Sequence, residues 1–272
     1  MIERRERGLG IVAWTDPSGH LMSLDGLSDR DRVEVERSAA EARSAVLACV
    51  DVDRYLDPPA ESPYGLEYAF YLLGDIRGRT VLDLGCGSGE NLVPLAKRGA
   101  DVVGIDISPE LIQLARQRVW GYGLAATVRE GSAYATGLPD QSVDVVFSMA
   151  LLHHLDLPAA RNEIYRILRP GGLFILREPI RFSRTMNALR RLFPAPEADI
   201  SDYEHPMTRD ELSAVTQGFT VVAQRNFRLP FVPLLMKFKA IRGQVWKTDC
   251  WLLKHFPSLE HFATGKVMSL RK

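Results

Sequence analysis

The 272-residue sequence is poor in cysteine. Its three cysteines, Cys49, Cys86 and Cys250, are widely spaced and form no CxxC pair or Cys/His cluster. This pattern argues against a disulfide framework and against a structural zinc site, and we predict no metal site. Because disulfides persist mainly in oxidising compartments, we expect a reduced, cytoplasmic protein.

An excess of either charge and a long apolar run are also missing. Basic and acidic residues number 34 each, so the formal net charge is zero. A domain-wide nucleic-acid surface would need a basic excess, and we therefore expect no nucleic-acid partner. No apolar stretch is long enough to span a bilayer. The basic start, MIERRERGLGIVAW, lacks the continuous apolar run of a signal peptide.

Residues 1–63 predict a hairpin followed by a helical cap. The segments GIVAW and HLMSL flank DPSG, which is typical of a type I turn. A helix is expected from about Asp29 to Cys49, with Ser28 as its N-cap.

The pair Ser62-Pro63 predicts an N-cap and first residue of a further helix. Tyr64, Tyr68 and Tyr71 would lie on one face of that helix, because their spacings are four and three residues. Such tyrosines usually pack in a core, although one of them can also face a ligand.

Residues 64–272 predict a doubly wound α/β domain with a mostly parallel sheet. Apolar strands that alternate with helices indicate parallel strands covered on both faces. Thr208 to Glu211 has the pattern of a capping box and predicts a late helix. The expected strands are TVLDLG, ADVVGIDI, AATVREG, SVDVVFSMA, GGLFILREP, FTVVAQRNF and GKVMSLRK.

Three glycines within five positions, Gly85, Gly87 and Gly89, follow the first of these strands. Glycine costs roughly 0.5–1 kcal/mol relative to alanine in a regular element, so this cluster indicates a sharp turn that a ligand approaches closely. In a doubly wound sheet, ligands bind beyond the carboxyl ends of the strands. Asp106 ends the next strand, where a carboxylate can accept both hydroxyls of a ribose. The loop and Asp106 together predict a nucleoside site.

The spacing GxGxG differs from the GxGxxG of dinucleotide-binding loops, and Asp83 lies just before it. A carboxylate there would repel a pyrophosphate, which disfavours an NAD-dependent dehydrogenase. The blocks VLDLGCGSG, ADVVGIDI, LPDQSVDVVFSMALLHHL and ILRPGGLFIL follow in order over about residues 65–180. This arrangement resembles the class I S-adenosylmethionine (SAM) methyltransferases, with a Rossmann-like fold. The segment MALLHHL stands where a base-amino methyltransferase would carry Asn-Pro-Pro-aromatic or Asp-Pro-Pro-aromatic.

The resemblance implies SAM as cofactor, S-adenosylhomocysteine as product and a role for individual residues. Asp83 and the loop Gly85, Cys86, Gly87 and Gly89 would hold the methionine portion, and Asp106 the ribose. Cys86 is expected as a small loop residue and not as a nucleophile. Asp144 is expected to fix the entry of its strand. The remaining cofactor contacts implied are Ile107, Ser132 and Ala133 at the adenine, the backbone of Met149, and Tyr64.

Candidate bases lie after strands four and five. His153 and His154 follow the fourth expected strand and Glu178 ends the fifth; histidine accepts protons near neutral pH. Either histidine can instead pack the turn, and an amine or thiolate acceptor needs no base. His205, in a polar loop, is a further candidate for the pocket.

The acceptor is expected at insertions after strands five and six, residues 179–207 and 228–263. We predict a small, hydrophobic or aromatic acceptor methylated at oxygen, nitrogen or carbon. Two alternatives stay open: a quinone- or lipid-pathway methyltransferase at a membrane, and a SAM-binding partner protein without turnover. Residues 228–255 are apolar and cationic, which is typical of a peripheral membrane contact or of a covering layer with solvated lysine heads.

Overall fold

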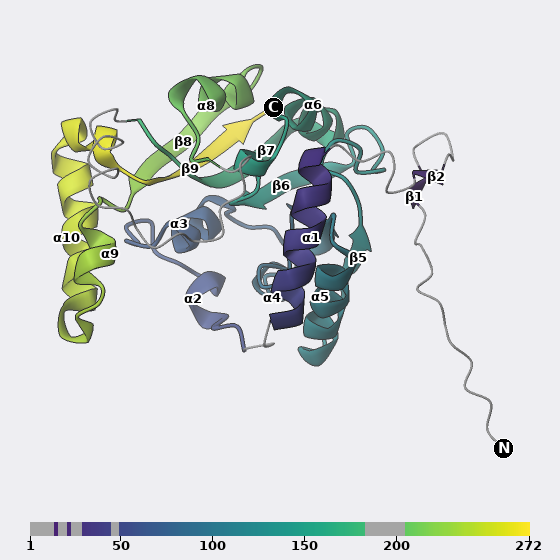
Figure 1. Cartoon of the computed structure of the whole chain (residues 1–272), viewed down its shortest axis with the longest axis horizontal. Helices are drawn as coiled ribbons and strands as arrows, with labels where there is room; N and C mark the ends of the chain where they lie inside the picture. The colour runs from purple at the N-terminus through teal and green to yellow at the C-terminus, as the bar shows by residue number, and fades with distance from the viewer. Residues whose placement is uncertain (1–13, 16–20, 23–28, 45–48, 183–204) are drawn as a thin grey trace.

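The computed structural model describes residues 14–15, 21–22, 29–44, 49–182 and 205–272. A seven-stranded sheet runs through it in the order β5-β4-β3-β6-β7-β9-β8 (Figure 1). All seven predicted strands are confirmed. They are β3 (Thr80–Leu84), β4 (Asp101–Asp106), β5 (Thr127–Glu130), β6 (Val143–Met149), β7 (Leu168–Pro179), β8 (Thr220–Phe227) and β9 (Gly265–Arg271).

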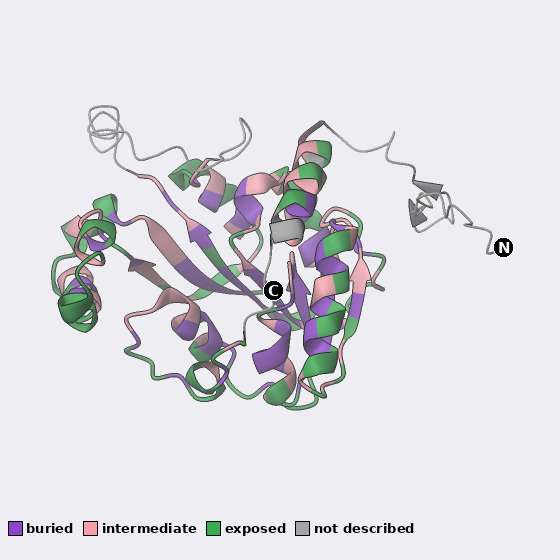
Figure 2. Cartoon of the chain, turned by 60° about the horizontal axis from the view of Figure 1, so that its bottom comes forward, coloured by how far each residue is buried: buried purple, intermediate pink, exposed green. Residues whose placement is uncertain are grey.

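The sheet is parallel except for β9, which pairs antiparallel with both β7 and β8. Helices α3 (Gly65–Leu72), α4 (Leu92–Lys97) and α5 (Pro109–Gly121) pack on one face. Helices α6 (Leu157–Ile167) and α8 (Arg209–Thr216) pack on the other. Both faces of the central strands are therefore buried, as Figure 2 shows, whereas the edge strand β8 is mostly exposed. The doubly wound fold is confirmed.

Helix α1 (Asp29–Ser44) lies beside α5, and α2 (Asp53–Leu56) packs on α3 and α4 (Figure 1). The late helices α9 (Val232–Leu235) and α10 (Arg242–His255) follow β8 and lie at the end of the molecule next to it. The short elements are β1 (Trp14–Thr15), β2 (Leu21–Met22), η2 (Leu152–His154), η3 (Lys239–Ile241) and η4 (Pro257–Phe262).

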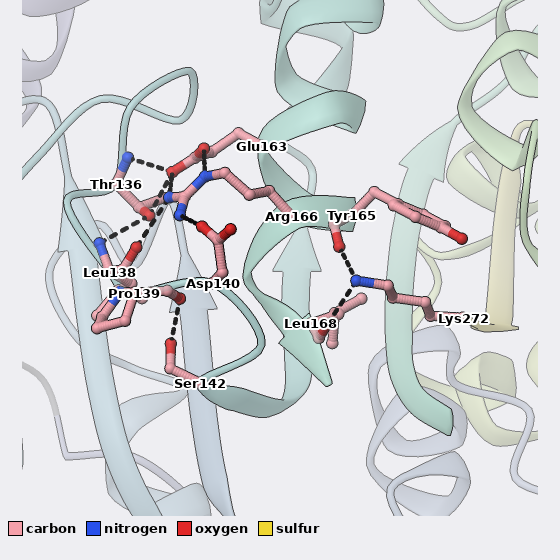
Figure 3. A network of polar contacts seen from close by, with 10 residues as sticks. All are labelled: Thr136, Leu138, Pro139, Asp140, Ser142, Glu163, Tyr165, Arg166, Leu168 and Lys272. Carbon is pink, nitrogen blue, oxygen red and sulfur yellow. Dashed lines mark hydrogen bonds and ion pairs between the residues drawn. The ribbon is translucent and has the colours of Figure 1, made fainter. Parts of the chain in front are cut away.

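A buried polar network fixes the loop between β5 and β6 (Figure 3). The Glu163 carboxylate of α6 accepts hydrogen bonds from the backbone N–H of Thr136, at 2.7 Å, and from its hydroxyl, at 2.6 Å. Arg166 pairs with Glu163 and Asp140 and donates to the Leu138 carbonyl. These contacts hold the loop that follows the carboxyl end of β5 against α6.

Two local predictions about capping and strand entry are confirmed. Thr208 and Glu211 form the reciprocal capping box of α8. The Asp144 carboxylate accepts the backbone N–H of Thr80 at 2.9 Å and pairs with Arg169, which ties β6 to the entry of β3.

Several element boundaries differ from the prediction. Helix α1 ends at Ser44, and Cys49 is not helical. Helix α3 begins at Gly65 because the Ser62 hydroxyl instead accepts the N–H of Tyr64 and donates to Glu67. Strand β7 begins at Leu168, ahead of the predicted GGLFILREP, and residues 169–172 form an irregularity in its pairing: Leu168 pairs with Val143 and Leu173 with Val145.

Three predictions fall outside the described residues: the N-cap Ser28, the DPSG turn between β1 and β2, and nearly all of the insertion after β7. The two strands of the hairpin do pair, with Trp14 opposite Met22. Among the described residues, no helix is both long and apolar enough to cross a membrane.

Candidate cofactor and active site

A cavity of about 270 Å³ lies at the carboxyl ends of β3, β4 and β6, with α1 over it. This is where a doubly wound sheet binds its ligand. The structure brings together there eight of the fourteen predicted site residues: Gly85, Gly87, Asp106, Ile107, Ser132, Ala133, Met149 and His154.

The glycine loop is held in place by the end of β4. The N–H groups of Gly85 and Cys86 both donate to the Ile105 carbonyl, at 2.8 and 3.0 Å. The Asp106 carboxylate accepts the N–H of Gly87 at 2.8 Å and that of Ser108 at 3.0 Å. Burial raises the pKa of Asp106, and these N–H groups act against that rise because they stabilise the ionised form.

Gly87 and Gly89 must be glycine for different structural reasons. Gly87 has φ +51°, and a Cβ added there would meet no atom within 4 Å, so it faces open space in the cavity. Gly89 has φ +82°, and a Cβ there would lie 2.9 Å from Cα of Ala115, so it lets the loop pack on α5. Gly87 is thus the position where a ligand can approach the backbone, whereas Gly89 is required for packing.

Two predicted residues, Cys86 in the loop and Asp83 just before it, do not line the cavity. Burial raises the pKa of the Cys86 thiol far above its usual range, which agrees with its expected role as a small loop residue. Asp83 is fully buried, and neither of its carboxylate oxygens has a hydrogen-bond partner. Burial, with a contribution from Asp106, raises the pKa of Asp83 to about 8. A buried carboxylate with no donor fits a ligand that brings an ammonium group or another cation.

The wall opposite the glycine loop is organised by Glu178. One of its oxygens accepts the N–H groups of Leu151 and Leu152, at 3.0 and 2.9 Å, and the other contacts Nδ1 of His153 at 2.8 Å. Glu178 is fully buried by these contacts. We therefore assign it to the shape of the turn after β6, where Ala150 has the strained φ of +58°.

The two histidines of that turn face different surroundings. His154 lines the cofactor cavity, and its Nδ1 lies 3.3 Å from the Glu34 carboxylate of α1. The hydrogen bond from His154 lowers the pKa of Glu34. His153 lines a separate cavity of about 350 Å³, beside His205 and α8. His205 itself pairs with Glu211 at 2.8 Å and does not reach the cofactor cavity.

Helix α1 adds three polar or charged lining residues that sequence reasoning missed, and Tyr64 is one of the six predicted residues that do not line the cavity. Glu34, Arg37 and Ser38 of α1 line the cavity, although no motif marks them. Tyr64 lies away from it, with its ring 5.3 Å from that of Trp246. In the described part of the chain, no group of three or more His, Cys, Asp or Glu side chains could hold a metal ion.

The fold is doubly wound, and the cavity lies where such a sheet binds its ligand. Comparisons with known proteins indicate the class of protein. The family described as "Methyltransferase domain" matches residues 82–176. A ubiquinone biosynthesis O-methyltransferase from Alkalilimnicola ehrlichii is 27% identical over 199 residues, which cover 68% of this chain and 81% of that protein.

Two solved structures share the fold at lower identity. One is a geranyl diphosphate C-methyltransferase from Streptomyces coelicolor in complex with Mg²⁺, geranyl diphosphate and S-adenosylhomocysteine. Its TM-score is 0.60 at 15% identity, over 90% of this chain and 98% of that one. The other is the [4+2]-cyclase SpnF, with a TM-score of 0.55 at 17% identity, over 88% and 92% of the two chains. Together these findings support a class I SAM-dependent methyltransferase, with the methyltransferase domain matched over residues 82–176.

The first prediction concerns the pH dependence of Asp83. Its folded pKa of about 8 lies above the value near 4 of an unfolded chain, so the folded state retains a proton that the unfolded state loses. Stability of the ligand-free protein should therefore fall as pH rises from about 4 to about 8 and level off above. Asp83→Asn should remove up to roughly 1.4 kcal/mol per pH unit of that slope. Thermal unfolding at pH 5, 6, 7 and 8 measures it, and equal slopes in both proteins would contradict the assignment.

The second prediction concerns the open space at Gly87. Gly87→Val should abolish SAM binding, because the side chain would occupy the cavity. Gly78→Val is the matched control: Gly78 also has a positive φ, +66°, and open space around its Cβ position, but lies outside the cavity. Both variants carry similar backbone strain, so calorimetric titration should detect lost binding only at Gly87. Equal loss in both would show that strain alone, and not occupation of the site, is responsible.

Proposed function

We propose that this protein transfers a methyl group from SAM to oxygen, nitrogen or carbon of a small, hydrophobic or aromatic organic acceptor. The observation that carries the proposal is the combination of three features at one edge of the sheet. They are the open space at Gly87, the Asp106 carboxylate at the end of β4, and the unpartnered carboxylate of Asp83.

The chain's own residues suit each portion of SAM. Asp106, whose oxygens keep lone pairs after accepting two N–H groups, would accept the ribose hydroxyls. Ile107, Ser132 and Ala133 would border the adenine. Asp83 would lie below the methionine ammonium group. When bound, SAM supplies the electrophilic methyl group, and S-adenosylhomocysteine is left.

The remaining work of the protein is to orient the acceptor and, for a hydroxyl, to remove its proton. We assign the removal of this proton to His154, because His154 lines the cofactor cavity whereas His153 faces the other side of the turn. Glu34 would orient the imidazole of His154 through its Nδ1 contact. An amine or thiolate acceptor would need no base.

A second candidate is a lipid-borne acceptor such as a quinone precursor. It is favoured by the similarity to the Alkalilimnicola ehrlichii relative, a ubiquinone biosynthesis O-methyltransferase. A third is a SAM-binding protein without methyl transfer, since the fold also occurs in a chain described as a [4+2]-cyclase. Release of S-adenosylhomocysteine in the presence of acceptors would show methyl transfer, which the third candidate does not perform.

The third prediction tests the cofactor. In calorimetric titration, SAM should bind and NAD should not. Asp106→Ala should weaken SAM binding by roughly 1–3 kcal/mol, because it removes hydrogen bonds to the ribose as well as the acceptor for the Gly87 N–H. NAD binding without SAM binding would overturn the proposed function. Unchanged affinity in Asp106→Ala would place the ribose elsewhere.

The fourth prediction separates the two histidines. With a panel of phenols as acceptors, His154→Gln should lower kcat by about a hundredfold and flatten its rise with pH, because the proton acceptor is lost. His153→Gln should leave that pH profile in place, since its imidazole contacts Glu178 outside the cofactor cavity. The two variants share the same chemical change, so a larger effect at His153 would reverse the assignment.

A further inference from the structure

The end of the molecule beyond β8 exposes large apolar side chains. We call this the α9–α10 surface; it comprises the exposed residues of the segment 232–256, which holds α9, η3 and α10. Leu234 and Phe238 are 61% and 60% exposed, and Trp251 and Phe256 are 52% and 47% exposed. Ile241 is 40% exposed. Five large apolar side chains are therefore in water on two short helices and their connection, which is unusual for a surface without a partner.

Helix α10 packs against the rest of the protein on one side only. In its fourteen residues only Val245 and Asp249 are buried. Lys247 and Trp251, four residues apart, lie on the opposite side. The Trp251 ring stacks on His255 at 4.8 Å and contacts Phe256 at 5.7 Å, so its exposed position is supported by its own neighbours. Figure 2 shows this end of the molecule largely exposed.

The same surface is cationic. Its exposed basic residues are Lys237, Lys239, Arg242, Lys247 and Lys254. The acidic residue of this stretch, Asp249, is buried, and its carboxylate accepts the N–H groups of Arg228 and Leu229 at 2.9 and 2.7 Å. Lys254 pairs with Glu61. Lys237, Lys239 and Lys247 have no acidic partner among the described residues, so the surface presents positive charge around exposed apolar side chains.

We propose that the α9–α10 surface docks on an anionic lipid bilayer, with its apolar side chains in the interface and its lysines at the head groups. Apolar insertion and attraction to anionic lipid act together in such contacts. The formal charge of the whole chain is zero, so the concentration of positive charge here is local. A second copy of the same surface is a poorer occupant, because the two sets of cations would repel each other.

This docking goes beyond the proposed function and does not depend on it. None of the residues of the surface lines the cofactor cavity. The segment that carries the surface follows Phe227, the last residue of β8. Phe227 and Pro179, the last residue of β7, both pair with Gly265, so β8 ends at the same edge of the sheet as β7, the edge that holds the cavity. Docking would bring that edge near the bilayer, from which an apolar acceptor can be delivered.

The fifth prediction is tested by cosedimentation of the full chain with vesicles. Vesicles of phosphatidylcholine plus phosphatidylglycerol should pellet the protein, and phosphatidylcholine alone should not. Added salt should release it. Trp251→Asp should abolish pelleting. Trp120→Asp is the matched control, because Trp120 is 83% exposed on α5 and should bind as the unmodified protein does. Lys237→Glu with Lys239→Glu should weaken binding by about thirtyfold.

Three results would overturn the proposal: no pelleting with anionic vesicles, equal loss in Trp251→Asp and Trp120→Asp, or self-association that Trp251→Asp abolishes. Light scattering detects the last of these, which would identify the surface as a contact between copies. Titration with SAM on each variant keeps the two proposals distinct. Retained SAM affinity with lost vesicle binding supports docking, and failure of SAM binding in every protein would count against the proposed function alone.

Discussion

The carboxylate of Asp106 is the contact on which the arrangement of the cofactor site depends. It ends β4, accepts the N–H of Gly87 and accepts the N–H of Ser108, whose side chain caps α5. One side chain thus joins a strand, the glycine loop and a helix. The loop glycines permit many conformations, and this double acceptor selects the one in which the Gly87 backbone faces the cavity.

A second carboxylate, that of Glu178, holds the turn after β6 on the opposite wall of the cavity, as Asp106 holds the glycine loop. Glu178 ends β7 and is contacted by two backbone N–H groups and one imidazole of the turn after β6. Those contacts account for the strained φ of Ala150, since a backbone outlier persists only where its surroundings hold it. Glu178 is not among the residues that line the cavity, so we expect its role to be structural.

The sequence predicted the parts of the structure that follow from local chemistry. Apolar runs predicted every strand of the sheet, and the glycine spacing with Asp106 predicted the loop that lines the cavity. Contributions from distant segments could not be predicted this way: Glu34, Arg37 and Ser38 enter the site only because α1 packs on α5. Tyr64 failed to reach the cavity because its ring packs on Trp246, whose helix is far away in the sequence. The start of α3 was misplaced because the Ser62 hydroxyl has a second partner in Glu67.

Asp83 shows how the site links folding to the charge of its ligand. A carboxylate in a fully buried position without a donor destabilises its ionised form, which is why its pKa rises to about 8. An ammonium group placed beside it would lower that pKa again, because opposite charges favour ionisation. At neutral pH, burial disfavours the ionised form of Asp83 in the ligand-free protein. A cationic ligand would relieve this cost and would therefore bind more tightly than a neutral one. A neutral or anionic group at the same place would gain nothing, so we expect this one buried residue to favour a cationic ligand over a neutral or anionic one of similar shape.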